Sequence, residues 1–174
     1  MIAPVLPAAP WRRLAAACYD GLLLLALWMV TLLASLFVCS LFGLARNDQV
    51  NSLCLFLVGL VFFGWSWTHG GQTLGMRSWR LQLRRVDGAA VRWPVAATRY
   101  ALMLASWGLA LAVVALPLLP PAVAAMVPHR AEAIGACAIY SGISLLLLLL
   151  DGRRRTPYDR ITSTEVVLLP RGDG

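Results

Sequence analysis

Hydrophobic residues fill four long stretches of the chain, at residues 14–45, 50–68, 99–119 and 131–150. Only one ionisable side chain, that of Asp20, lies well inside a stretch, whereas Arg99 and Glu132 stand at the ends. A helix needs about 20 apolar residues to cross the ~30 Å hydrocarbon core of a bilayer. The pattern therefore predicts an all-α integral membrane protein with four transmembrane helices.

The whole chain, residues 1–174, is predicted to form one membrane domain. We place its spans at about 20–44, 50–68, 98–119 and 131–150, with a connecting loop at 69–97 and a tail at 151–174. Hydrophobic residues make up 60% of the sequence and charged residues 13%, whereas soluble domains are roughly 45–50% apolar. The spans leave no room for a separate soluble catalytic domain.

The first apolar stretch is longer than one membrane crossing requires. Its 32 residues would form a helix of about 48 Å, against ~30 Å of hydrocarbon. If Arg46 marks the outer end, the crossing part begins near Gly21 and Asp20 lies close to the inner boundary. A strongly tilted helix would place Asp20 deeper. An acidic group at such a position is a functional hypothesis, because charges within membrane helices are energetically expensive.

The loop between the second and third spans has a strand-like pattern. Residues 81–86 alternate apolar and polar side chains, Asp87-Gly88 supplies a turn, and residues 89–93 follow. An Asp-Gly pair between such runs is typical of a β-hairpin. We therefore predict a small cytoplasmic hairpin, preceded by a short helix at 73–80. A further short strand is expected at 165–169.

The positive charges are distributed unevenly between the two sides of the membrane. All 15 basic residues are arginines, and 13 of them lie before the first span, between the second and third, or after the fourth. By the positive-inside rule, both termini and the 69–97 loop are expected in the cytoplasm. We attribute the +7 net charge to anionic lipid headgroups on that side, not to nucleic acid.

No recognised constellation of catalytic or metal-binding side chains is present, so we expect neither enzymatic activity nor a cofactor or metal. The two histidines, His69 and His129, are expected on opposite sides of the membrane. The cysteines lack metal-binding spacing and are expected to be buried apolar residues; they are Cys18, Cys39, Cys54 and Cys137.

A glycine-rich segment, Gly71-Gln72-Thr73-Leu74-Gly75, follows the second span. It lacks the Gly-Lys-Ser/Thr ending and the preceding strand of a phosphate-binding loop. A flexible exit from the span, with Thr73 capping the next short helix, is the favoured interpretation.

Arg13 and Asp20 are seven residues apart and share one face of the first predicted helix. Their backbones are about 10 Å apart along the helix axis, so each side chain can instead meet a partner from another helix. For Asp20, the expected partners are Arg99 at the start of the third span and the arginines at 153–155.

Several of these motifs, taken in order, resemble the RDD family of bacterial multi-pass membrane proteins. They are Arg13-Leu-Ala-Ala-Ala-Cys-Tyr-Asp20, Gly71-Gln-Thr-Leu-Gly75, Val86-Asp-Gly88, Arg99 and Tyr158-Asp159-Arg160-Ile-Thr-Ser-Thr164. The resemblance identifies Arg13, Asp20 and Asp159 as the arginine and two aspartates that give the family its name. It implies a place in the bacterial inner membrane and transport of an unknown ligand, and sodium–proton exchange has been suggested for some members.

Two interpretations of the charged signature remain open. Arg13, Asp20, Arg99, Asp159 and Arg160 could form a charge network that locks the tail to the first helix. Alternatively, Asp20 is the carboxylate of a cation or proton site. The interpretations compete, because a nearby arginine lowers the pKa of a carboxyl group whereas a proton carrier needs that pKa raised by burial.

Two function classes follow from these interpretations. The first is a cation or proton exchanger that forms a homo-oligomer, since the few polar residues of four spans supply little of a transport route. Small residues of the fourth span, including Gly135 and Gly142, would allow close packing between helices. The second is a non-transporting scaffold that holds a partner on its basic cytoplasmic face.

Overall fold

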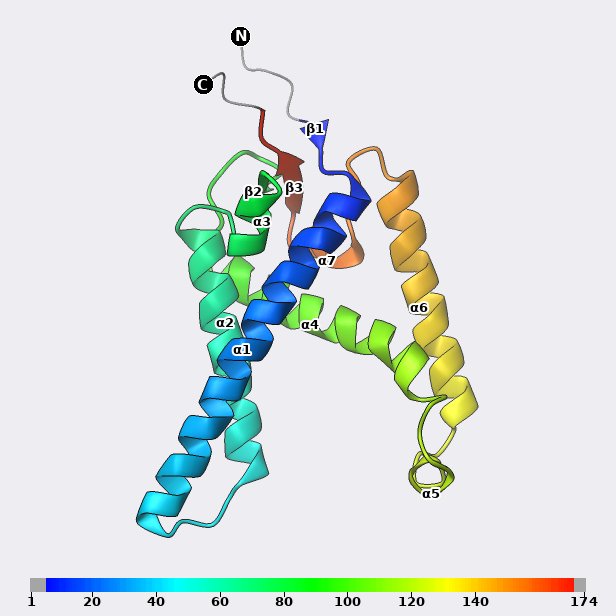
Figure 1. Cartoon of the computed structure of the whole chain (residues 1–174). Helices are drawn as coiled ribbons and strands as arrows, with labels where there is room; N and C mark the ends of the chain where they lie inside the picture. Colours follow the sequence, from blue (N-terminus) through cyan, green and yellow to red (C-terminus); the bar gives the residue numbers. More distant parts are fainter. Residues whose placement is uncertain (1–5, 171–174) are drawn as a thin grey trace.

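A computed structural model describes residues 6–170 and contains four long helices at the predicted places (Figure 1). They are α1 (Pro10–Phe42), α2 (Asp48–Thr68), α4 (Trp93–Ala115) and α6 (Arg130–Leu150). Each is long and apolar enough to cross a membrane, which confirms the four-span prediction.

Prolines set two boundaries of α4. This helix begins at Trp93, five residues earlier than predicted, because Pro94 occupies its first turn, where a missing backbone N–H is tolerated. It ends at Ala115, shortly before Pro117. A four-residue helix, α5 (Pro121–Ala124), then leads toward α6.

The long helices form an open arrangement. α1 packs on α2, α2 packs on α4, and α4 crosses to α6 at the opposite side of the molecule (Figure 1). Apolar side chains on the outer faces of α1 and α6 are exposed, including Leu22, Phe37 and Ile139. Such surfaces are suited to contact with lipid acyl chains.

A three-stranded antiparallel sheet lies at one end of the helices, which we call the sheet end. Its strands are β1 (Leu6–Pro7), β2 (Leu81–Arg85) and β3 (Thr164–Leu168), in the order β1-β3-β2. In the β2–β3 register, Leu81 lies opposite Leu168 and Arg85 lies opposite Thr164. The short strand expected in the tail is therefore confirmed as β3.

The predicted hairpin is correct in its first strand and its turn but wrong in its second strand. Gly88, with a φ of 78°, closes the turn by donating its N–H to the carbonyl of Arg85 at 2.9 Å. Residues 89–92 then leave the sheet, because the chain must enter α4 at Trp93. β2 pairs instead with β3, and this pairing buries Leu81 and Leu83.

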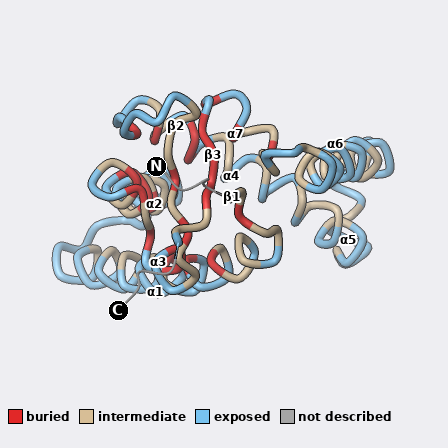
Figure 2. Tube along the Cα trace, turned by 90° about the horizontal axis from the view of Figure 1, so that it is seen from above, coloured by how far each residue is buried: buried red, intermediate tan, exposed pale blue. Residues whose placement is uncertain are grey.

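The core is concentrated at the sheet end, as the buried segments in Figure 2 show. There the first turns of α1 and α4 and the last turns of α2 meet the sheet and a short helix, α3 (Leu74–Ser78). Thr73 caps α3 by accepting the Met76 N–H at 3.2 Å, which confirms the predicted cap. This end is thus the most densely packed part of the described chain.

Candidate functional site

Asp159 lies in a short helix of the tail, α7 (Pro157–Ile161), at the sheet end. Thr156 caps this helix, and the Asp159 carboxylate accepts the Thr156 backbone N–H at 2.9 Å. This reciprocal capping box satisfies two backbone donors. It also turns the Asp159 side chain back toward the start of the helix.

Two arginines from different long helices converge on Asp159. Arg13 Nη2 of α1 lies 2.5 Å from Oδ2, and Arg99 Nη1 of α4 lies 2.5 Å from Oδ1. The Asp159 side chain is fully buried, and those of Arg99 and Arg13 are 4% and 11% exposed. We call these three residues the arginine clamp.

Further contacts fix both arginines of the clamp. The Arg99 guanidinium lies between the rings of Trp67 and Tyr158, 5.3 and 5.1 Å from their centroids. It also donates to the hydroxyl of Thr164 at 2.6 Å. Arg13 donates to the backbone carbonyl of Arg154. The clamp therefore joins α1, α4, α7 and β3.

The electrostatics of the clamp keep Asp159 ionised. Burial acts to raise the pKa of its carboxyl group, but the adjacent guanidinium groups of Arg99 and Arg13 hold that pKa well below its usual range. Removing one partner of such a buried ion pair typically costs about 3–5 kcal/mol. The clamp is thus suited to holding the tail against the helices.

Asp20 occupies a separate site, formed by α1 and the loop before α3. Its side chain is buried, and its carboxylate accepts the Thr73 hydroxyl at 2.5 Å and the Gly75 N–H at 2.9 Å. Among residues 6–170, none of the ion pairs includes Asp20. This carboxylate is therefore held by neutral donors alone.

The glycine-rich loop is built to approach Asp20 closely. A Cβ atom at Gly75 would lie 2.4 Å from the backbone oxygen of Ala16 and 2.9 Å from the Asp20 carboxylate. Gly71 has a φ of 68° and its carbonyl accepts the Leu83 N–H at 2.7 Å. Gln72 donates to the Leu81 carbonyl at 2.7 Å. These bonds hold the loop against β2, and the Thr73 hydroxyl and the Gly75 N–H of the loop then face Asp20 of α1.

The structure corrects the predicted partners of Asp20 and Arg160. Arg99 and the 153–155 segment are directed to the clamp and its surroundings, not to Asp20. Arg160 does not join the clamp, because its guanidinium pairs with Asp151 at 3.1 Å on the surface of the tail. Arg155 donates its backbone N–H to Asp151, and this hydrogen bond holds the pKa of Asp151 below its usual value.

Sequence reasoning missed the neutral donors of the Asp20 site and the aromatic rings around Arg99. Thr73 is 53 residues from Asp20, and nothing in either local sequence signals their contact. Tyr158 directly precedes Asp159, so its place beside the clamp was foreseeable from the tail motif. Trp67 is buried beneath Arg99, and nothing in the sequence around either residue signals this contact.

The arginine clamp and the Asp20 site both lie within the region that matches a known family. The family model described as the RDD family matches residues 7–163. The chain belongs to the RDD family. With its four apolar helices, it is a multi-pass membrane protein of that family. The comparisons with curated proteins and with solved structures gave no match.

Proposed function

We propose that this RDD-family protein is a transporter that exchanges a proton or a small cation at Asp20. The observation that supports the proposal is the burial of the Asp20 carboxylate among neutral donors, without an ion-pair partner in the described chain. A buried carboxylate that lacks a counter-charge is stabilised by taking up a proton or a cation. Asp159 is unsuited to this role because two arginines already neutralise it.

The proposed orientation places the sheet end in the cytoplasm of a bacterial cell, with the helices in the inner membrane. Its support is the distribution of arginines, 13 of which flank the spans on this side. In this orientation Asp20 lies near the cytoplasmic boundary, where it can exchange its proton or cation with the cell interior.

A route across the membrane requires more polar surface than one chain offers, so we propose a homo-oligomer. The open arrangement of α4 and α6 leaves Gly135 and Gly142 with no other residue within 4 Å of a Cβ built there. A helix of a second copy can approach closely at such positions. Several Asp20 sites would then share one assembly.

The experiment uses the purified full chain in liposomes that contain a pH-sensitive dye. Sodium, potassium and proton gradients are applied to the wild-type protein, to Asp20→Asn and to Asp87→Asn. Asp87 is a matched control, since its carboxylate is half-exposed, pairs with Arg85 at the surface and accepts the Ala89 N–H of its own turn. We expect cation-driven proton flux in the wild type and in Asp87→Asn, and none in Asp20→Asn.

Two outcomes contradict this proposal. Absence of flux in a folded wild-type protein under all three gradients rules out cation–proton exchange. Flux that persists in Asp20→Asn shows that another group carries the charge. Circular dichroism and size-exclusion chromatography establish that each variant is folded before its flux is compared.

A second candidate function is a membrane scaffold that binds an acidic partner. The supporting observation is the exposure of several arginines at the sheet end, among them Arg92 and Arg153. Crosslinking in intact cells would then recover one defined partner, and exchanging these two arginines for glutamates would abolish its capture. Preserved capture by that variant contradicts the scaffold proposal.

A further inference from the structure

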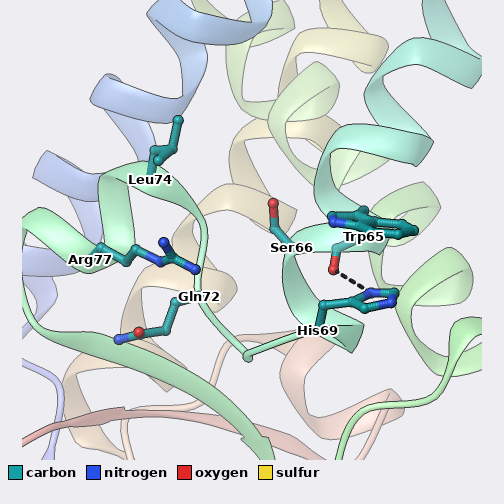
Figure 3. A pocket seen from close by; sticks show the side chains of 6 residues that line it. All are labelled: Trp65, Ser66, His69, Gln72, Leu74 and Arg77. Atoms are coloured by element: carbon teal, nitrogen blue, oxygen red, sulfur yellow. Dashed lines mark hydrogen bonds between the residues drawn. The ribbon is translucent and has the colours of Figure 1, made fainter.

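A small cavity lies at the sheet end where α2 finishes and α3 begins (Figure 3). Its volume is about 120 Å³, and it is lined by Trp65, Ser66, His69, Gln72, Leu74 and Arg77. Pockets for whole small molecules usually measure about 300–1,000 Å³. This one is the size of a single polar group at the end of a larger molecule.

The position of the cavity matches the headgroup layer of a bilayer. The 21 residues of α2 measure about 31 Å, close to the ~30 Å thickness of the hydrocarbon core. His69 directly follows this helix, so the cavity begins where the hydrocarbon core of the bilayer ends. At its rim, Trp65 and Leu74 are 58% and 52% exposed, which suits contact with glycerol and the upper acyl chains.

The guanidinium of Arg77 is available to a ligand. Arg77 is exposed, and among residues 6–170 it forms no ion pair and no side-chain hydrogen bond. Figure 3 shows its side chain extending from α3 toward the side of the cavity that Ser66 and His69 form. Within the described part of the chain, no aspartate or glutamate lines the cavity. An arginine fork in such a place favours phosphate oxygens.

The other polar side chains are already oriented by the protein. Nδ1 of His69 lies 3.2 Å from the carbonyl oxygen of Trp65, which can only accept, and 3.0 Å from the Thr68 hydroxyl, so Nδ1 is the donor (Figure 3). This assigns the proton of the neutral His69 ring to Nδ1 and leaves Nε2 for a ligand. The ring is held by stacking on Trp65, with centroids 3.8 Å apart. Gln72 uses one amide N–H on Leu81 and retains a second.

From this geometry we propose that the cavity binds the phosphate of an anionic phospholipid, with Arg77 as its principal ligand. Gln72 donates a further hydrogen bond to the phosphate, and Nε2 of His69 accepts one from a hydroxyl of the headgroup. Trp65 and Leu74 contact the apolar part of the lipid. The site is separate from Asp20 and does not depend on any transport activity.

The test measures lipid binding by the full chain in nanodiscs of phosphatidylcholine that contain a minor fraction of phosphatidylglycerol. Native mass spectrometry counts the phosphatidylglycerol molecules retained by the wild type, by Arg77→Gln and by Arg92→Gln. Arg92 is the matched control, because it is also an exposed arginine at the sheet end but lies outside the cavity. We expect one retained lipid per chain, bound about tenfold more weakly by Arg77→Gln and nearly unchanged in Arg92→Gln.

Three results would overturn the proposal. Equal losses in both variants would show diffuse attraction to a basic surface instead of a site. Displacement of the lipid by millimolar inorganic phosphate, with phosphate retained in its place, would make a soluble phosphate the ligand. A photoactivatable phosphatidylglycerol should crosslink to residues 65–77 of the wild type, and labelling elsewhere would refute the site even if Arg77→Gln did not fold.

Discussion

Asp20 and Asp159 are both buried at the sheet end, yet different kinds of donor meet their carboxylates. Asp159 is held between the guanidinium groups of Arg13 and Arg99. Asp20 is held by a hydroxyl and a backbone N–H. One of the two interpretations of the sequence placed both aspartates in a single charge network, whereas the structure separates them into a clamp and a neutral-donor site.

This separation decides what each aspartate can do. An ionised carboxylate between two arginines is stable in one protonation state, so it is suited to fastening elements together. A buried carboxylate without a counter-charge can instead be neutralised by a proton or a cation. The same helix, α1, supplies Arg13 to the first site and Asp20 to the second, so the fastened tail also positions the second site.

The largest expected effect is loss of the clamp. Asp159→Asn leaves Arg13 and Arg99 buried without their counter-charge, and we expect the free energy of unfolding to fall by about 3–5 kcal/mol. Asp87→Asn is the control, because an exposed pair contributes less than about 1 kcal/mol. Reversible unfolding in mixed detergent micelles measures both values. Equal changes in the free energy of unfolding for the two substitutions would show that the clamp does not stabilise the fold.

The loop that meets Asp20 should be sensitive to the volume of one methyl group. Gly75→Ala places a Cβ atom against the backbone of Ala16 and the Asp20 carboxylate, so we expect a loss of about 1–3 kcal/mol. Gly70→Ala is the matched control, since no atom lies within 4 Å of its new Cβ. The same unfolding measurement compares the two. A tolerated Gly75→Ala would mean that the loop does not press on α1.

Acid should weaken the clamp in a defined pH range. The pKa of Asp159 is lowered in the folded protein, so its stabilising contribution is complete above its unfolded pKa of ~3.9 and declines as pH falls toward the folded pKa. Between pH 5 and pH 3 we expect the free energy of unfolding to decrease by about 1 kcal/mol from this group. The decrease attributable to Asp159 should be absent in Asp159→Asn, and an identical acid response of both proteins would contradict this assignment.

The helices and short elements were predictable because their signals are local. Hydropathy locates the four spans, and Thr73 reads as the cap of α3. Hydropathy alone placed the start of α4 five residues late, because it does not register Pro94 in the first turn. Alternation of apolar and polar residues predicts β2 and its following turn. It does not specify a partner strand, and the hydrophobic residues of β3 pair with β2 from more than 80 residues away.

The composition of the two aspartate sites was less predictable. Opposite charges suggested that Arg13 and Arg99 would find aspartates, and both do so at Asp159. The same reasoning named arginines as the expected partners of Asp20 and included Arg160 in the charge network, and neither contact is formed. Neutral donors such as the Thr73 hydroxyl and the Gly75 N–H leave no charge pattern in the sequence.

The smallest expected effect on stability gives the sharpest comparison of the two sites. Asp20→Asn preserves the side-chain shape, and its amide oxygen can still accept the Gly75 N–H. The Thr73 hydroxyl can rotate to accept from the new amide group. We therefore expect the free energy of unfolding to change by less than about 1 kcal/mol, while the flux in liposomes disappears. A loss comparable to that of Asp159→Asn would show that the Asp20 charge is itself structural, and the two aspartates would then have the same role.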